Sequence, residues 1–318
     1  MKNLKSLARW FLARSWLAGA RYLLWAHYAR RDSRATEHFA EQSGVSLAQV
    51  FKAPILTSPT TKNLFILGSG SSVNEMTREQ FQHVARHESI GINFWFFHDF
   101  VPNLFSFDAG RAKPSEQEQG KRSLVTLGRL FNRTSVLAAR PKVLYLRPHA
   151  SDEDFLFPIS EDLQSGAWVS GRANMLSLTE AALETDIRVM LRRLTRHALP
   201  AAVLPDNGSS VVRLVFLGLS QGYRHIVLCG VDLDSRPHFW MNDDYAERYP
   251  EHVKLFPAPD DKLHGTAEAR GRPLGNLEFL VLLDRVLREE KVGQLFVGSP
   301  SSRLSGLLSP YSWPESGD

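Results

Sequence analysis

A glycine-rich turn is the first feature of this sequence that could do chemistry. Gly68-Ser69-Gly70-Ser71 follows an apolar run at 63–67 and precedes a helical stretch that begins near Asn74. Such a turn brings backbone amides and a helix N-terminus close to a phosphate or a sugar. It is neither the complete dinucleotide fingerprint, because Val73 stands where the third glycine would fall, nor a P-loop. The turn predicts nucleotide binding, with an ordinary tight turn as the alternative.

Two further turn segments could contribute to the same site. Ser209-Ser210 precedes a helix expected at 211–221, and Gly230-Val231-Asp232 follows a strand expected at 225–230. Asp232 and Asp234 also form an Asp-x-Asp pair, which in many nucleotide-sugar transferases binds a divalent ion that bridges the diphosphate. Short pairs of this kind are common by chance, so the metal site is the less favoured interpretation.

These turns are positioned by alternating strands and helices. Continuous apolar runs predict buried strands, and 3.6-residue periodicity predicts helices. The strands are expected at 63–67, 89–93, 104–107, 142–147, 225–230 and 294–297, and the helices at 123–132, 179–197, 211–221 and 276–290. This alternation predicts an α/β fold with a Rossmann-like, doubly wound, mostly parallel sheet, which binds ligands beyond the carboxyl ends of its strands. Residues 235–275 have little periodicity and are predicted to form a lid.

The N-terminal segment differs in charge from the rest of the chain. Residues 1–31 carry seven basic groups and no acid, which leaves 31 basic and 34 acidic groups elsewhere, a net charge of −3. Tryptophan, tyrosine and leucine lie between these basic residues, a pattern typical of an amphipathic helix on an anionic membrane surface. Arg14 and Arg21 interrupt the apolar runs that a signal peptide or a spanning helix needs. The alternative is a helix docked on the domain or on another subunit.

The chain is therefore expected to contain three parts. These are a basic amphipathic membrane-surface helix at 1–31, a linker with a short helix at 32–62, and a nucleotide-binding catalytic domain at 63–318. The single Cys229 excludes a disulfide framework and favours a cytoplasmic protein, here placed at the inner face of the cell membrane. The slightly acidic body and the lack of a recognisable motif argue against nucleic acid as a partner. A homo-oligomer is left open.

Four stretches of the sequence together resemble a known family. They are 65–72, 91–94, 210–232, and 276–279 with 299–302. In this order they are similar to the bacterial sialyltransferases of glycosyltransferase family 42. The resemblance implies a GT-A-variant-like Rossmann fold and a cytidine-monophosphate (CMP) sugar as donor, with no catalytic metal or other cofactor required.

The resemblance also implies roles for individual residues. Gly68, Ser69, Gly70 and Ser71 form the nucleotide turn, with Ser69 where the family usually has asparagine. The other residues implied in donor binding are Asn93, Asp108, Ser209, Ser210, Gly230 and Asp232. Of these, Asn93 matches an asparagine that contacts the nucleotide, and Asp232 helps to shape the nucleotide pocket.

A histidine is the implied general base. His264 lies nearest the family's catalytic histidine, and an imidazole with a pKa near 6.5 can accept a proton from an acceptor hydroxyl at neutral pH. His238 and His252 are the competing candidates. The sequence departs from the family where tyrosine hydroxyls would meet the leaving phosphate, because Asp234 and Trp240 stand there. The residues that could substitute are Tyr245, Tyr249, Lys262 and Arg270.

The resulting hypothesis is an inverting glycosyltransferase. It would transfer an acidic sugar, a sialic acid or a related ulosonic acid such as Kdo, from a CMP-sugar to a membrane-linked glycan or glycolipid. Two alternatives remain. One is a pterin diphosphokinase-like enzyme, which would need ATP, Mg²⁺ and carboxylates such as Asp232 and Asp234. The other is a non-catalytic nucleotide-binding subunit of an envelope-polysaccharide assembly.

Overall fold

The structure is a computed structural model that describes most of the chain. The described residues are 15–48, 56, 63–108, 142–146, 167–195, 202–241, 243–248, 250, 268–269 and 271–314. The strands are β1 (Ser46–Leu47), β2 (Asn63–Leu67), β3 (Glu88–Ile92), β4 (Leu104–Asp108), β5 (Lys142–Leu146), β6 (Trp168–Asn174), β7 (Val203–Asp206), β8 (His225–Cys229), β9 (Gln294–Val297) and β10 (Ser309–Pro310). The α-helices are α2 (Ala18–Ser43), α3 (Arg78–Ala85), α7 (Glu180–Leu194), α8 (Ser210–Ser220), α9 (Asp243–Arg248) and α11 (Asn276–Glu289).

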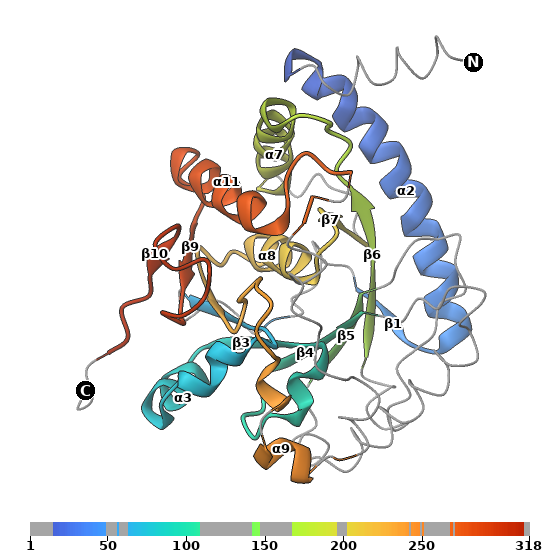
Figure 1. Ribbon diagram of the computed structural model, residues 1–318. Coiled ribbons are helices and arrows are strands. Elements are labelled where there is room, and N and C mark those ends of the chain that lie inside the picture. The colour runs from blue at the N-terminus through green and yellow to red at the C-terminus, as the bar shows by residue number, and fades with distance from the viewer. Residues whose placement is uncertain are drawn as a thin grey trace.

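The strands form one twisted parallel sheet. Its order is β1-β6-β5-β4-β3-β2-β8-β9-β10, with β7 paired to β6, and each of these pairings is parallel (Figure 1). Starting from β2, the chain builds β3 to β6 outward on one side and then returns to place β8 and β9 on the other side. The predicted doubly wound parallel sheet is confirmed.

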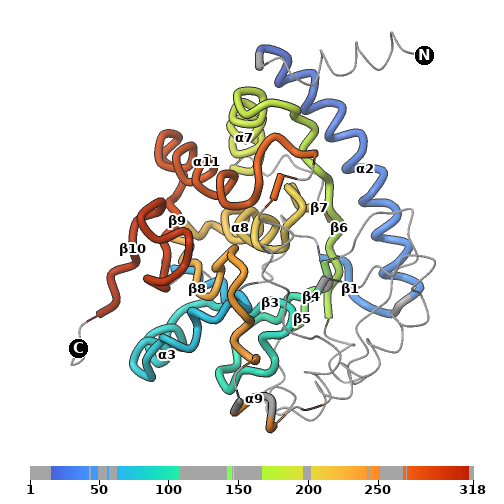
Figure 2. The backbone as a smooth tube through the Cα atoms, in the orientation of Figure 1, coloured from blue at the N-terminus to red at the C-terminus, as the bar shows by residue number. Residues whose placement is uncertain are grey.

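Both faces of the sheet are covered. Leu64 and Ile66 of β2 belong to a core shared with α7, α8 and α11, whereas Phe65 and Leu67 belong to a second core on the other face. The tube in Figure 2 shows α3 apart from α7, α8 and α11. A strand that is apolar at every position is thus buried on both sides, as the continuous apolar run at 63–67 predicted.

Helix α2 is longer than expected and lies along β6 at the edge of the fold (Figure 1). It runs from Ala18 to Ser43 without a break and ends at Gly44 in the left-handed conformation, with φ of 66°. The helix therefore crosses the boundary expected between residues 31 and 32, and it includes the short helix expected within residues 32–62. Trp25 of this helix is buried and donates a hydrogen bond from Nε1 to the Ala173 carbonyl, at 3.1 Å.

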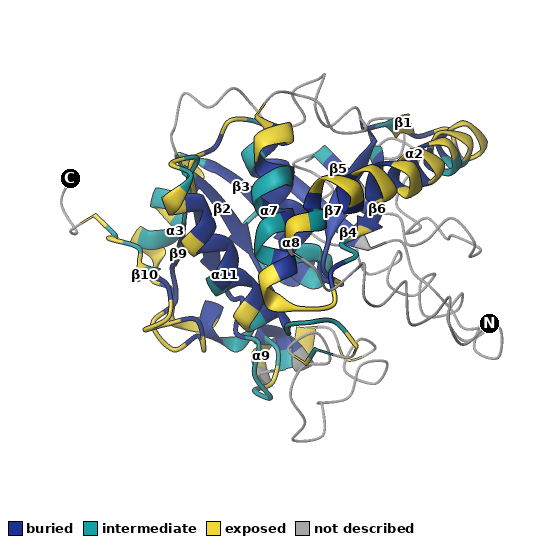
Figure 3. Ribbon diagram, turned by 90° about the horizontal axis from the view of Figure 1, so that it is seen from above, coloured by how far each residue is buried: buried dark blue, intermediate teal, exposed yellow. Residues whose placement is uncertain are grey.

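The docked helix keeps an exposed face. Arg21, Tyr22, Trp25 and Ala29 are buried against the domain, whereas the opposite side is open to solvent along its length (Figure 3). The large apolar residues exposed on α2 are Leu23, Leu24 and Tyr28, and Trp16 is exposed in the 3-10 helix Ser15–Leu17 just before it. No helix within the described ranges is long and apolar enough to cross a membrane. The alternative of a docked helix therefore holds for residues 18–43, and membrane contact through the exposed face stays a prediction.

Four strands differ from the sequence analysis, because β1, β6, β7 and β10 were not predicted. Strands β1 and β10 have two residues each, and the sequences of β6 and β7 mix small and polar residues with few apolar ones. In the expected lid at 235–275, Phe239 and Trp240 are buried in the second core, and the lid stays a prediction. The helix predicted at 123–132 and residues 251–267 of the lid lie outside the described residues.

Candidate functional site

The predicted turns meet where the sheet reverses its winding direction. Strand β2 lies between β3 and β8, and the chain leaves β2 on one side and β8 on the other. Crevices beyond the carboxyl ends of strands at such a point are the usual ligand sites of open α/β sheets. The turns that follow β2, β3 and β8 all lie at this edge, together with the N-terminus of α8.

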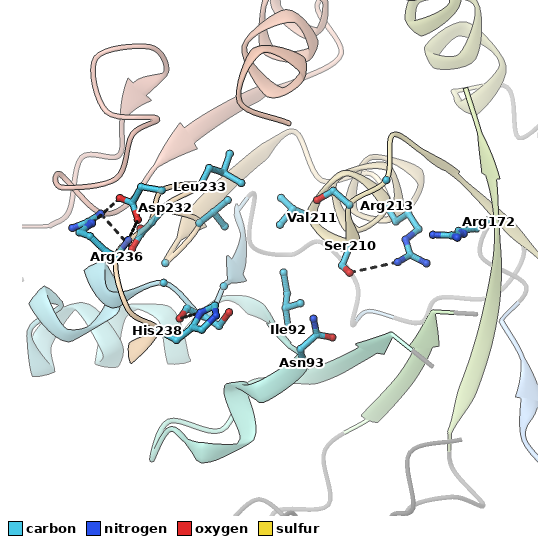
Figure 4. A pocket seen from close by; sticks show the side chains of 18 residues that line it. Ile92, Asn93, Arg172, Ser210, Val211, Arg213, Asp232, Leu233, Arg236 and His238 are labelled. Atoms are coloured by element: carbon cyan, nitrogen blue, oxygen red, sulfur yellow. Dashed lines mark hydrogen bonds and ion pairs between the residues drawn. The ribbon is translucent and has the colours of Figure 1, made fainter. Parts of the chain in front are cut away.

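A cavity of about 310 Å³ occupies this crevice (Figure 4). It is formed by five segments that are separate in the sequence. Its lining residues are Gly68, Ser69, Gly70, Ile92, Asn93, Arg172, Gly208, Ser209, Ser210, Val211, Arg213, Gly230, Val231, Asp232, Leu233, Asp234, Arg236 and His238. The structure thus brings Ser69 and Ser210 to one cavity, which the predicted nucleotide site required. The volume lies at the low end of the range of small-molecule pockets.

The turns after β2 and β8 are joined directly through their backbones. The Gly68 amide donates to the Cys229 carbonyl at 2.7 Å, and the Gly70 amide donates to the Gly230 carbonyl at 2.8 Å. A Cβ atom on Gly68 would lie 2.4 Å from the Gly230 oxygen, and one on Gly70 would lie 2.3 Å from Oδ2 of Asp232. The glycines are needed for this close packing, and their amides are used within the protein.

Asp232 holds the two turns together with its carboxylate. It accepts hydrogen bonds from the Ser72 amide at 3.0 Å and from the Ser72 hydroxyl at 2.5 Å. Burial raises the pKa of Asp232, although these two hydrogen bonds and the Arg236 charge act in the opposite direction. The carboxylate therefore joins the β8 turn to the start of the segment after β2, and its role is to shape the cavity wall.

An arginine lies between the two aspartates of the Asp-x-Asp pair. Arg236 Nε is 2.6 Å from Oδ2 of Asp234, and Arg236 Nη2 is 3.4 Å from Oδ2 of Asp232. The Arg236 guanidinium already pairs with both carboxylates, so a divalent ion would have to displace it to bind there. Within the described ranges, no cluster of three histidine, cysteine, aspartate or glutamate residues is suited to hold a metal ion.

The second hydroxyl-bearing turn is shaped by a buried aspartate. Oδ1 of Asp206, at the end of β7, accepts hydrogen bonds from the Gly208 amide at 2.8 Å and the Ser209 amide at 3.0 Å. Gly208 has φ of +76°, a conformation that glycine adopts without strain. The turn directs the first residues of α8 into the cavity, where Ser209, Ser210 and Val211 form part of its wall.

Asn93 follows β3 and lines the middle of the cavity. Its φ of 50° places it in the left-handed region, which asparagine tolerates better than most residues do. Asp108 is the last residue of β4, and its side chain lies outside the described structure. Ser71 begins a 3-10 helix, Ser71–Glu75, and is not among the described lining residues. Their roles in donor binding stay predictions.

One of the three candidate histidines lines the cavity. His238 Nδ1 is 3.2 Å from the Ser69 carbonyl oxygen, and its ring stacks on Trp240 at 4.4 Å with an interplanar angle of 12°. His252 and His264, the predicted general base, lie outside the described residues.

The two residues that stand where the family has tyrosines both have partners within the protein. Asp234 pairs with Arg236, and Trp240 is buried beneath His238. Of the possible substitutes, Tyr245 is buried against Phe239, with ring centroids 5.5 Å apart. The other three, Tyr249, Lys262 and Arg270, lie outside the described residues.

Three arginines of the cavity were missed by sequence reasoning. Arg213 lies on α8 between residues that are almost all apolar, and a lone charge on such a helix was the signal that could have found it. Arg236 is four residues from Asp232 in the segment taken for a lid. Arg172 lies on β6, a strand that was not predicted, so no local pattern indicated it. Arg172 also lines a second cavity of about 350 Å³ next to the first.

Comparison with known proteins gives matches among solved structures. No protein-family model matches the chain, and no curated protein matches it. The chain is similar to sialyltransferases of known structure. One is CstII from Campylobacter jejuni in complex with the substrate analogue CMP-3FNeuAc, with 13% identity, coverage of 79% of this chain and 86% of that chain, and a TM-score of 0.37. Another is the monofunctional alpha-2,3-sialyltransferase Cst-I from Campylobacter jejuni, with 14% identity, coverage of 80% and 82%, and a TM-score of 0.39.

These proteins are bacterial sialyltransferases, the kind that the sequence motifs resemble. At this identity and these TM-scores, the likeness transfers neither an activity nor a ligand to this chain. The cavity and its lining residues have to carry any statement about function.

Proposed function

We propose that the chain is an inverting glycosyltransferase that uses a CMP-activated acidic sugar, a sialic acid or a related ulosonic acid such as Kdo. One observation carries this proposal: three turn segments that the sequence singled out converge on one cavity at the switch point of the sheet. They are the turns at Gly68–Gly70, Ser209–Ser210 and Gly230–Asp232. Asn93 lies between them, as the resemblance implies for a nucleotide contact.

The proposed reaction needs no metal ion. The oxygen of an acceptor hydroxyl forms a bond to the anomeric carbon of the sugar from the face opposite the phosphate, while the bond from that carbon to the phosphate oxygen breaks. The bonding electrons leave with CMP, and the acceptor proton passes to a histidine. His264 is the predicted base, and His238, which lines the cavity, is the competing candidate. Positively charged groups at the cavity would stabilise the developing charge on the leaving phosphate.

The binding step can be tested by isothermal titration with CMP and with UDP. We expect CMP to bind more tightly, and an absence of CMP binding would remove the proposal. Val211 lines the cavity at the start of α8, so Val211→Trp should fill the space and abolish CMP binding. Leu307→Trp is the matched control, because Leu307 is an exposed apolar residue elsewhere. Equal CMP affinity in the wild type and Val211→Trp would show that CMP binds somewhere else.

The base is tested separately from binding. His264→Ala should abolish sugar transfer while leaving CMP affinity within about 3-fold of the wild type, a change of less than about 0.7 kcal/mol. Full transfer by this variant would end the assignment of His264. His238→Ala in the same assay decides whether the histidine at the described cavity is the base instead.

We also propose that the acceptor is linked to a membrane and that α2 contacts the anionic surface of that membrane. Leu23 of α2 is 67% exposed, and Trp16, in the short 3-10 helix Ser15–Leu17 just before α2, is 71% exposed. Arg30, Arg31 and Arg34 are exposed further along the same helix. Apolar and aromatic residues next to basic ones favour the interface of an anionic bilayer, where each basic residue contributes about 1 kcal/mol.

Sedimentation with lipid vesicles tests this surface. The protein should bind vesicles that contain phosphatidylglycerol and should not bind pure phosphatidylcholine. Leu23→Glu should weaken binding at least about 10-fold, whereas Leu307→Glu, at an exposed site outside α2, should have no effect. If both variants bind as the wild type does, α2 makes no contact with the membrane.

A further inference from the structure

The charges of the described cavity are distributed unevenly between its two ends. At one end, Arg236 is paired with Asp232 and Asp234. At the other end, Arg172 of β6 and Arg213 of α8 approach each other and share Asp206. Figure 4 shows the two groups separated by Ile92, Asn93 and Val211. Among the described residues, one guanidinium at the first end contacts the carboxylates of Asp232, Asp234 and Glu75, and two guanidiniums at the second end contact the carboxylate of Asp206.

The contacts of the two arginines with Asp206 are long. Arg172 Nη1 is 3.4 Å from Asp206 Oδ2, and Arg213 Nε is 4.0 Å from Asp206 Oδ1. A strong charge-assisted hydrogen bond would be about 2.7 to 2.9 Å long. The short contacts of Asp206 go to backbone amides of its own turn instead. In addition, Nε of Arg172 is buried and has no hydrogen-bond partner among the described residues.

The end of the cavity with the two arginines is also the N-terminus of α8. Arg213 Nη2 lies 3.4 Å from the Ser210 hydroxyl oxygen, so the guanidinium reaches back to the first turn of its own helix. The Ser209 side chain makes no capping hydrogen bond to the helix. The positive end of the helix dipole adds to the charge of the two guanidiniums and favours an anion there.

From this arrangement we propose that Arg172 and Arg213 form a carboxylate subsite that binds the acid group of the donor sugar. The inference rests on the proposed function and extends it to the sugar. A guanidinium presents two parallel N–H groups that match a planar carboxylate, which makes arginine more selective for it than lysine. An ulosonic acid carries its carboxylate on the anomeric carbon, next to the phosphate. The two arginines thus distinguish an acidic sugar donor from a neutral one.

The position of Arg172 is fixed from behind by helix α2. Its backbone amide donates a hydrogen bond of 2.9 Å to Oδ2 of Asp32, which is buried on that helix. At the preceding residue, a Cβ on Gly171 would lie 2.4 Å from Oγ1 of Thr36. Close packing of α2 on β6 therefore holds the guanidinium at the border of the two cavities. A rigid support of this kind is what a specificity-determining residue needs.

The test compares the binding affinities of CMP and of an analogue, a CMP-sialic acid that carries fluorine at carbon 3 of the sugar and resists transfer. The wild type should bind this analogue more tightly than CMP. Arg172→Met and Arg213→Met should each weaken analogue binding about 10- to 100-fold while changing CMP affinity less than about 3-fold. Arg172→Lys should recover part of the loss, because it restores the charge without the planar fork. Arg224→Met is the matched control, an exposed arginine just before the amino end of β8, and should bind as the wild type does.

Several results would overturn the inference. If the variants lose CMP and analogue affinity equally, the arginines bind the nucleotide and not the sugar. If neither affinity changes, or if the wild type binds the analogue no better than CMP, no carboxylate subsite exists. These outcomes differ from failure of the proposed function, in which the wild type does not bind CMP at all. Should Arg213→Met unfold, Arg213→Lys replaces it, with an expected loss of analogue affinity of about 10-fold.

Discussion

The attachment of α2 to the domain depends on a buried ion pair, and its removal gives the sharpest prediction about stability. Arg21 and Asp186 are 1% and 5% exposed. Arg21 Nε lies 3.0 and 2.9 Å from the two carboxylate oxygens, and Nη2 lies 2.6 Å from Oδ1. Nη2 also donates to the Ala182 carbonyl at 3.1 Å, and the Ser177 hydroxyl donates to Asp186 at 2.5 Å.

The magnitude follows from what each substitution leaves behind. Arg21→Met keeps much of the side-chain volume but leaves the Asp186 carboxylate buried, with the Ser177 hydroxyl still donating to it. Breaking a buried pair in this way costs about 3 to 5 kcal/mol, against a total stability of about 5 to 15 kcal/mol. Replacing both partners removes both charges from the interior. Arg21→Met with Asp186→Leu should therefore lie within about 2 kcal/mol of the wild type.

The assay is equilibrium unfolding in urea, followed by circular dichroism and tryptophan fluorescence at pH 7. The double-mutant cycle should give a coupling energy of at least about 2 kcal/mol. Arg192→Met is the matched control, because Arg192 pairs with Glu290 in an exposed position and its side chain is 62% exposed. Its loss should cost less than about 1 kcal/mol. Limited proteolysis at residues 15–43 distinguishes local release of α2 from global unfolding.

Two results would refute this reasoning. If Arg21→Met costs less than about 1 kcal/mol by unfolding and leaves α2 as resistant to protease as in the wild type, the pair does not hold the helix. If the double variant is as unstable as the sum of the single variants, the two residues act independently and the ion pair does not couple them.

Three other predictions concern single positions. Gly70→Ala should weaken CMP binding at least about 10-fold and lower the folding stability by about 1 to 3 kcal/mol, because its Cβ would overlap the Asp232 carboxylate. Gly19→Ala is the control, because its Cβ would meet nothing within 4 Å. Equal CMP affinity and stability of the two variants would contradict the close packing of the two turns. Burial lowers the pKa of His98 to about 4, so the unfolded chain takes up the proton first and stability should fall as pH drops from about 6.5 to 4. His98→Asn, which can still accept the Phe100 amide hydrogen bond, should reduce this loss by about 2 to 3 kcal/mol in urea unfolding, whereas His27→Asn on the exposed side of α2 should not. Burial raises the pKa of the Cys229 thiol, so a thiol reagent should label it only as fast as the protein unfolds, and rapid labelling of the native protein would show that the core at β8 is open.

The sequence alone predicts an element correctly where a local pattern determines that element. The apolar run at 63–67 forms β2, and the helix expected at 211–221 is α8, shifted by one residue. The turns at Ser69 and Ser210 could be placed in one site because parallel strands in a doubly wound sheet expose their carboxyl ends at the same edge. These predictions need only periodicity, glycine and the rule for where such sheets bind ligands.

The sequence alone does not predict the role of a residue when that role depends on a partner far away in the sequence. Strand β6 contains Gly171, which is required because Asp32 and Thr36 of α2 approach it closely, and no local pattern contains that information. Arg21 was counted as one of seven basic residues of a membrane anchor. Its partner Asp186 lies on a different helix, so the charge count could not distinguish a buried ion pair from a solvated arginine.

The two glycine turns use their backbone amides within the protein, so an anion in this cavity has to be bound by other groups. In many nucleotide sites the amides of such a turn bind the phosphate. Here the amides of Gly68, Gly70 and Ser72 already donate to Cys229, Gly230 and Asp232. The described wall also holds the N-terminus of α8 and the guanidiniums of Arg172, Arg213 and Arg236. Helix α2 supports the backbone of Arg172. The helix that is proposed to contact the membrane therefore also positions a residue that is proposed to bind the carboxylate of the donor sugar.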